Sequence, residues 1–299
     1  MKKAAIIVPV ATVWTDPKSA REMDRPVLAE EGMTRGWIDG MNDAEKLDLC
    51  TNNRVQTQVL FGEEVLVEAE EGGWSKVLVP SQPTSKESLG YPGWIPSAQI
   101  GGAPLHPGKE MAVVIKETAR LKAGEKEMDL YYGTILSIAR RDGDKMWAET
   151  PIGTGYLDSA ALKIIDPDNH ATGQDLIASG LQFVGLPYLW GGMSNLGYDC
   201  SGFVYTMCKV HGIRIPRDAH DQAAFGKEVA LDALEPGDAL FFAYEEGKGS
   251  IHHVGFYYGD GKLLHSPKTG ECIEVTELKG FSYEKELCAA RRYSSEGSL

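Results

Sequence analysis

The chain has 299 residues, of which 42% are hydrophobic and 24% are charged, a balance typical of a folded protein rather than a disordered one. This length exceeds one ordinary domain, so we expect two or three modules. The formal net charge of -13 argues against nucleic acid and anionic membranes as partners, because binding to either requires clustered Lys and Arg.

The N-terminal segment, Ala4 to Trp14, is apolar and predicts a β-strand. Two lysines before it give a superficial likeness to an export signal, but Pro9 interrupts the apolar run and no cleavage site follows. No apolar run approaches the ~18 residues of a membrane-spanning helix. Five cysteines leave at least one thiol unpaired and show no metal-binding spacing. We therefore expect a reduced, cytoplasmic protein, with export as the alternative.

An internal repeat occupies the N-terminal half. Residues 59–62 (VLFG) begin a pattern of alternating apolar residues, a glycine turn and a Trp, and residues 130–133 (LYYG) begin it again. Residues 93–100 and 155–162 close the two copies with similar sequences. Short strands of period two joined by glycine turns predict two small β-barrels.

The first copy contains an additional segment, residues 16–53, which is too long for a loop. Its apolar residues are spaced like one face of a helix, namely Trp37, Ile38, Met41, Leu47 and Leu49. We therefore expect a helical insertion in the first barrel. The Gly- and Pro-rich residues 101–108 and residues 166–169 are interpreted as linkers. The predicted domains are 1–104, 105–166 and 167–299.

The third domain begins with two predicted helices. Thr172, with Asp175 three residues later, is typical of a helix capping box, and Gly185 is expected to end that helix. A second helix is expected to begin near Cys200 and to end at Gly212.

A run of strands follows these helices. The segments with strand patterns are residues 239–244, 252–258 and 262–265. A three-residue loop, 259–261, would pair Tyr258 with Lys262 in a hairpin. Helices followed by a run of strands indicate an α+β domain.

Cys200 is the candidate nucleophile. It stands in the first turn of its helix, where unsatisfied backbone N–H groups and the positive end of the helix dipole favour an anion. We therefore expect a lowered thiol pKa and a reactive thiolate. The other four cysteines are interpreted as small hydrophobic residues: Cys50, Cys208, Cys272 and Cys288.

The candidate base is His253, one of seven histidines. The hairpin pairing puts it on one face with His265, as diagonal neighbours roughly 7 to 8 Å apart at Cα. One ring would take the thiol proton while the other fixes its tautomer. A structural role for these residues is the alternative, and a zinc site built from them lacks a fourth ligand. His220 is a rival base, but its predicted helix gives it no strand partner.

Five segments in order over residues 172–299 resemble the NlpC-type murein peptidases: 187–192 (PYLWGG), 199–204 (DCSGFV), 215–218 (IPRD), 234–242 (LEPGDALFF), and 253–257 (HVGFY) followed by 264–266 (LHS). This resemblance implies a papain-like cysteine peptidase domain. It implies Cys200 as nucleophile, His253 as base and His265 as the third polar residue. No cofactor and no metal are expected.

The same resemblance implies roles around the nucleophile. The Tyr188 hydroxyl would help the backbone N–H of Cys200 to hold the oxyanion, with packing in the loop core as its alternative role. The candidates for substrate binding are four polar residues and one loop aromatic: Asp199, Ser201, Arg217, Asp218 and Trp190. Ordinary caps or surface polar groups are the alternative for the polar four.

The N-terminal repeat resembles the bacterial SH3-like modules, and the whole arrangement resembles the YkfC-type γ-D-glutamyl-L-diamino acid endopeptidases, which recycle cell-wall peptides. In that group the first barrel walls off the cleft and recognises the free N-terminus of the substrate. Tyr91 and Trp94 are the candidates for this contact, with barrel packing as the alternative.

The partners implied are small L-Ala-γ-D-Glu-diamino acid peptides. The diamino acid, meso-diaminopimelate or Lys, and the oligomeric state are left open. Two alternatives are an exported endopeptidase that remodels intact wall and an inactive wall-binding protein, and the intact Cys200, His253 and His265 set argues against the second.

Overall fold

The structure is a computed structural model that describes residues 1–29, 32–102, 110–166 and 171–294. The chain divides into two compact units, Met1–Ile165 with Met193–Leu196, and Asp166–Gly192 with Gly197–Leu299. Most of the two predicted linkers, at 101–108 and 166–169, lies outside the described residues. None of the helices in the described ranges has the length and apolar character needed to cross a membrane.

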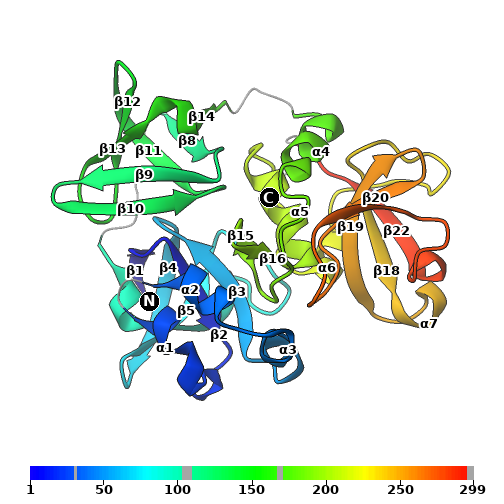
Figure 1. Cartoon of the computed structure of the whole chain (residues 1–299), viewed down its shortest axis with the longest axis horizontal. Coiled ribbons are helices and arrows are strands. Elements are labelled where there is room, and N and C mark those ends of the chain that lie inside the picture. The colour runs from blue at the N-terminus through cyan, green and yellow to red at the C-terminus, as the bar shows by residue number, and fades with distance from the viewer. Residues whose placement is uncertain (30–31, 103–109, 167–170, 295–299) are drawn as a thin grey trace. The chain divides into compact units, whose positions relative to one another are not determined.

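The first unit contains two seven-stranded antiparallel sheets (Figure 1). The first has the order β3-β2-β6-β5-β4-β1-β7 and the second has the order β10-β9-β13-β12-β11-β8-β14. Adding seven to each strand number of the first sheet gives the second, so the sequence repeat corresponds to a repeat of strand order.

The strands of the first sheet are β1 (Lys2–Ile6), β2 (Val10–Trp14), β3 (Val55–Leu60), β4 (Glu64–Glu71), β5 (Trp74–Val79), β6 (Tyr91–Pro96) and β7 (Ile100–Gly101). Those of the second are β8 (Met111–Val114), β9 (Thr118–Ala123), β10 (Lys126–Tyr131), β11 (Ile135–Asp142), β12 (Lys145–Glu149), β13 (Gly155–Asp158) and β14 (Leu162–Ile165). Burial alternates along β9, where Ala119, Leu121 and Ala123 enter the core, as a half-buried strand requires.

The N-terminal segment differs from the single strand predicted over Ala4 to Trp14. It forms β1 and β2, which pair with different neighbours: β1 with β4 and β7, and β2 with β3 and β6. Pro9 lies between them, and a residue without an N–H cannot continue a strand ladder on its donor side. The single-strand prediction is therefore wrong.

Three α-helices occupy the segment between β2 and β3: α1 (Arg25–Leu28), α2 (Thr34–Asp39) and α3 (Asp43–Thr51). Asn42 caps α3 through a capping box with Glu45. Trp37 is buried, and its indole N–H donates to Asp24 at 2.7 Å. Leu47 differs from the predicted apolar face, because it is 49% exposed.

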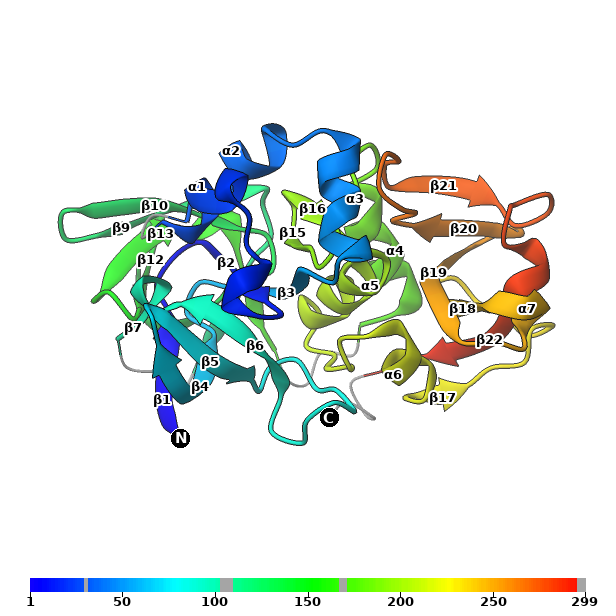
Figure 2. The same ribbon diagram turned by 90° about the horizontal axis from the view of Figure 1, so that it is seen from below.

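The second unit places helices beside a six-stranded antiparallel sheet of order β17-β22-β18-β19-β20-β21 (Figure 2). Its helices are α4 (Gly173–Leu181), α5 (Cys200–Lys209), α6 (Ala219–Ala223) and α7 (Tyr244–Gly247). Its sheet strands are β17 (Lys227–Glu228), β18 (Ala239–Ala243), β19 (Ile251–Gly259), β20 (Lys262–His265), β21 (Glu274–Glu277) and β22 (Leu287–Arg292). Two short strands, β15 (Met193–Ser194) and β16 (Gly197–Tyr198), precede α5. The chain is thus a mixed helix and sheet protein.

The capping box predicted for α4 is confirmed. Thr172 Oγ1 accepts a hydrogen bond from Asp175 N at 3.3 Å, and Asp175 Oδ2 accepts one from Thr172 N at 2.7 Å. The helix ends at Leu181, earlier than the predicted stop at Gly185. α5 begins at Cys200, as predicted.

The hairpin between β19 and β20 has a different turn from the predicted one. Gly259, rather than Tyr258, is paired with Lys262, so the loop has two residues, Asp260 and Gly261. Both have positive φ, 50° and 71°, which the tight turn requires. A bulge after Tyr257 absorbs the shift, so the predicted pairing still holds from Tyr257 toward the histidines.

Candidate active site

Cys200 is buried at the N-terminus of α5. Asp199 is the N-cap, and its Oδ1 accepts a hydrogen bond from Gly202 N at 2.6 Å. Phe203, one turn into the helix, packs edge-on against Phe256 of β19 with ring centroids 6.2 Å apart. The helix therefore presents the cysteine beside β19.

The Cys200 sulfur lies beside the backbone of β19 at the residue that follows the predicted base. The N–H of Val254, the residue after His253, hydrogen-bonds to it, and so does the N–H of Ser201. Both bonds favour the thiolate. Burial nevertheless raises the pKa of the Cys200 thiol to about 12, and the charge of Asp199 adds to the rise. The helix dipole predicted a lowered pKa, whereas burial in the fold raises it.

His253 and His265 are brought together as the strand pattern predicted. Nε2 of His253 lies 2.8 Å from Nδ1 of His265, and both rings are buried. Gly255 makes this approach possible, because a Cβ at that position would lie 2.6 Å from the Cβ of His265. The hydroxyl of Ser266 donates to the carbonyl of Tyr198 at 2.8 Å, which ties the end of β20 to the segment before Cys200.

The two rings are neutral near pH 7. Burial and the neighbouring His265 hold the pKa of His253 well below its usual range, and burial lowers the pKa of His265 to about 4. A base that accepts a thiol proton at Nδ1 carries hydrogen on Nε2, so we assign the His253 Nε2–H as donor to His265 Nδ1. A neutral thiol and a neutral imidazole therefore describe the resting site.

A buried ion pair holds the two residues that flank Cys200. Arg217 Nη2 lies 2.6 Å from Asp199 Oδ2, and Arg217 Nη1 donates to Ser201 Oγ at 2.8 Å. Gln222 Nε2 donates to the carbonyls of Ser201 and Pro216, each at 3.0 Å. Three of the residues predicted to bind substrate, Asp199, Ser201 and Arg217, are thus bonded to one another; their role toward a substrate stays a prediction.

We expect Arg217→Met to lower the free energy of unfolding by roughly 3 to 5 kcal/mol, because the Asp199 carboxylate would be left as a buried, uncompensated charge. Urea unfolding of the full chain measures the change. Lys262→Met is the matched control, because it breaks an ion pair with Glu277 that is 3.6 Å long and solvent-exposed, and such pairs contribute ~1 kcal/mol or less. A loss at Arg217 no larger than the control would contradict this account.

The loop before the nucleophile carries Tyr188 and Trp190. The Tyr188 N–H donates to the carbonyl of Glu271 at 3.0 Å, and Tyr188 bridges to Tyr198, so its backbone is fixed on two sides. Its side chain is buried, and Trp190 is half-buried. Their predicted roles toward the oxyanion and the cleft stay predictions.

Tyr91 and Trp94 both lie on β6 of the first unit. Tyr91 is only 2% exposed and belongs to the core of the first sheet, where its hydroxyl accepts a hydrogen bond from Lys86. Trp94 is half-buried and pairs in register with Lys76. Their predicted contact with a substrate amine stays a prediction.

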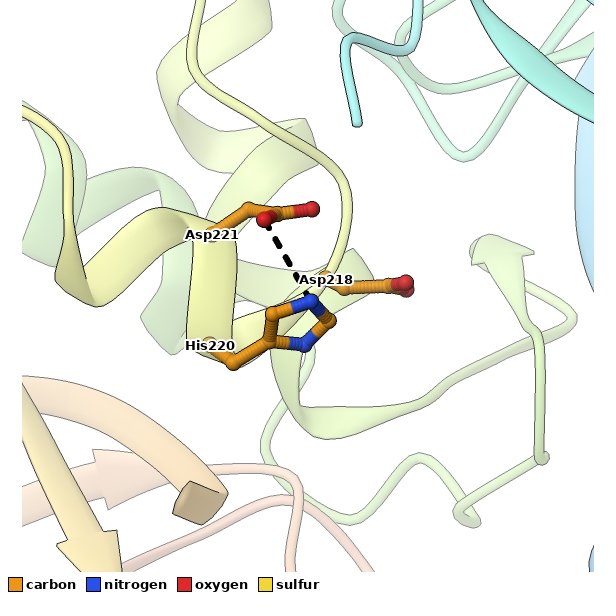
Figure 3. Close-up of side chains that lie close together, drawn as sticks. All are labelled: Asp218, His220 and Asp221. Atoms are coloured by element: carbon orange, nitrogen blue, oxygen red, sulfur yellow. Dashed lines mark ion pairs between the residues drawn. The ribbon is translucent and has the colours of Figure 1, made fainter. Parts of the chain in front are cut away.

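Asp218, His220 and Asp221 lie together at the start of α6 (Figure 3). His220 Nε2 is 3.3 Å from Asp221 Oδ1, and its side chain is 54% exposed. The three side chains offer ligand atoms within 4.8 Å of one another, which is close enough for a metal ion, although exposed acidic groups commonly gather without one. His220, the rival base, is therefore engaged with acidic neighbours on α6.

Sequence reasoning missed the aromatic residues around the two histidines. The Tyr283 ring lies 5.5 Å from the His253 ring, and the Phe281 ring lies 5.2 Å from the His265 ring. Glu274, opposite His265 in the β20–β21 register, has Oε1 3.6 Å from His265 Nε2. The pattern of β21 is too short to have revealed these contacts from the sequence.

The candidate nucleophile, base and base-orienting group thus come together from α5, β19 and β20, in the arrangement that a cysteine peptidase requires. Comparison with known proteins makes this more specific. Residues 185–292 match the NlpC/P60 family. The chain is 48% identical over 295 residues to a γ-D-glutamyl-L-lysine dipeptidyl-peptidase of Bacillus subtilis (strain 168), covering 97% of this chain and 99% of that protein.

A second protein of the same name, from Bacillus cereus (strain ATCC 10987 / NRS 248), is 39% identical over 97% of this chain and 91% of its own length. The crystal structure of an NlpC/P60 family protein from Bacillus cereus ATCC 10987 superposes with a TM-score of 0.92 at 37% identity, over 98% of this chain and 99% of that one. The chain belongs to the NlpC/P60 family of cysteine peptidases.

Proposed function

We propose that this chain hydrolyses the bond between γ-D-Glu and the diamino acid in short murein peptides whose N-terminal L-Ala is free. The observation that carries the proposal is the 2.8 Å contact between His253 and His265, beside a cysteine at a helix N-terminus. The near full-length similarity to two proteins named γ-D-glutamyl-L-lysine dipeptidyl-peptidase supports the choice of bond.

In the first half of the reaction, the Cys200 sulfur attacks the γ-carbonyl carbon of D-Glu while His253 takes the thiol proton. Because thiol and imidazole are both neutral at rest, this transfer accompanies the attack rather than preceding it. The carbonyl oxygen becomes an oxyanion, for which the Cys200 N–H and the Tyr188 hydroxyl are the proposed donors.

Collapse of this intermediate breaks the amide bond. His253 gives its proton to the departing α-amine of the diamino acid, and a thioester remains on Cys200. A water molecule, deprotonated by His253, then attacks the thioester; the C–S bond breaks, the Cys200 sulfur takes the proton back from His253, and L-Ala-γ-D-Glu is released. His265 keeps the His253 ring in the required tautomer and orientation throughout.

The two N-terminal sheets are proposed to be SH3-like modules, and the catalytic domain is proposed to be papain-like. The identical strand order of the two sheets supports the first assignment. The second is supported by a cysteine at the start of helix α5 together with a histidine on strand β19. The first module is proposed to recognise the substrate amine, with Tyr91 and Trp94 as candidate contacts and Glu63 as an optional acidic partner.

A cytoplasmic, peptide-recycling role is proposed over the remodelling of intact wall. Free thiols at Cys200, Cys208, Cys272 and Cys288 support a reducing compartment. Recognition of a free amine would also confine the enzyme to peptides already released from their sugars.

Acetylation of the L-Ala amine is expected to lower kcat/KM at least tenfold relative to the free peptide, which corresponds to ~1.4 kcal/mol of lost transition-state binding. A buried ammonium must find an acidic or aromatic partner, and the acetylated peptide has no ammonium to offer. The measurement compares L-Ala-γ-D-Glu-L-Lys with its N-acetyl form at equal concentration on the full chain. Equal rates, or faster cleavage of intact wall, would favour the wall-remodelling alternative.

A further inference from the structure

A cavity of about 480 Å³ opens in the second unit. Its lining includes Phe281 and Tyr283, the aromatic residues that contact the two histidines of the site. Phe281 packs on His265 and Tyr283 packs on His253, and both line the cavity. A third wall is the segment at Glu271, whose carbonyl accepts the Tyr188 N–H. The cavity therefore borders the histidine side of the site.

This position matches the leaving group in the proposed reaction. The acyl part of the substrate stays on the Cys200 sulfur, whereas the departing amine must receive its proton from His253. That amine is attached to the α-carbon of the diamino acid, and the side chain starts at the same carbon. The diamino acid side chain thus begins beside His253, and the adjoining space is the one bounded by Tyr283 and Phe281.

The lining suits a side chain with an apolar stem and a cationic end. Val184, Phe281 and Tyr283 supply apolar surface, and Glu271 and Glu274 supply carboxylates. A diamino acid such as Lys lays its methylene stem along apolar groups and brings its ammonium to an acidic or aromatic partner. Glu271 is held by an exposed ion pair with Lys268 of 3.3 Å, which a ligand ammonium displaces at little cost.

A buried polar atom next to two residues of the cavity lining, Phe281 and Glu274, has incomplete polar contacts. His265 Nε2 has no hydrogen-bond partner among the described residues, although its side chain is fully buried. The nearest acidic group is Glu274 Oε1 at 3.6 Å, which is too long for a hydrogen bond. Glu274 is itself 51% exposed and lines the cavity, so its carboxylate is open to a ligand.

We infer that this cavity binds the side chain of the departing diamino acid, with Glu271 and Glu274 as the groups that hold its terminal ammonium. The inference rests on the proposed function, because it places the residue after the cleaved bond. Glu271 and Glu274 are then specificity-determining residues. A peptide with an uncharged residue of the same length after the cleaved bond should be cleaved with a lower kcat/KM.

The test compares L-Ala-γ-D-Glu-L-Lys with the same peptide ending in norleucine, which keeps the stem and lacks the ammonium. We expect the wild-type chain to prefer the Lys peptide by about tenfold in kcat/KM. In Glu271→Gln this preference should fall to about twofold or less, since a neutral amide cannot form an ion pair with the ammonium. Glu271 is the better position to change, because Glu274 also lies beside His265.

Glu277→Gln is the matched control, because Glu277 is an exposed acid at the far end of β21 and does not line the cavity. It should keep the tenfold preference. Equal cleavage of the two peptides by the wild-type chain, or an unchanged preference in Glu271→Gln, would overturn the inference and leave the proposed function standing. If neither peptide is cleaved, both the inference and the proposed function would be overturned.

Discussion

Replacing Cys200 by Ala or Ser is expected to abolish peptide hydrolysis while leaving the fold intact. The alanine variant has no nucleophile. The serine variant keeps a hydroxyl, but its proton is harder to remove than that of a thiol, and the buried position that already raises the thiol pKa to about 12 penalises an alkoxide further. Release of the diamino acid, followed by chromatography, measures the activity, and circular dichroism checks the fold.

Cys50→Ala serves as the control for this result. Cys50 lies on α3 in the first unit and takes no part in the proposed reaction, so the variant should hydrolyse the peptide at the wild-type rate. Full retention of activity in Cys200→Ala would show that another group is the nucleophile.

His253→Ala is expected to cost several orders of magnitude in kcat, because this ring both accepts the thiol proton and returns it to the leaving amine. His265→Ala should cost less, because it orients the base without exchanging a proton with substrate. His265→Asn should recover part of that loss, since its side-chain oxygen can accept the His253 Nε2–H in place of Nδ1. Steady-state kinetics on one peptide compares all three.

His252→Ala separates a catalytic effect from a packing effect. The His252 ring stacks on Tyr244 at 4.2 Å and pairs with Glu286 at 2.9 Å, so its loss should mainly reduce stability. Small and equal effects at His253 and His265 would mean that the base has been wrongly identified.

The sequence predicted those parts of the molecule that local patterns control. The capping box of α4, the start of α5 at Cys200 and the approach of His253 to His265 each depend on residues within one helix or one hairpin. The turn between β19 and β20 was predicted one residue too long, but the bulge after Tyr257 restored the pairing near the histidines. An error at the turn therefore did not carry through to the site.

The features that could not be predicted depend on burial and on contacts between distant segments. The helix dipole at Cys200 suggested a low thiol pKa, whereas the surrounding core raises it. The ion pair between Arg217 and Asp199 joins residues 18 positions apart, and the motif that predicts Arg217 as a substrate ligand gives no sign of this partner. Phe281 and Tyr283 follow β21 in the sequence, and only the folded chain places their rings against the two histidines.

The most direct test of the central claim is the digestion of L-Ala-γ-D-Glu-L-Lys by the full chain, with the products identified by mass spectrometry. Two products are expected, the dipeptide L-Ala-γ-D-Glu and free L-Lys, formed by the wild-type chain and not by Cys200→Ala. Release of L-Ala as the first product, or the same two products from Cys200→Ala, would contradict it.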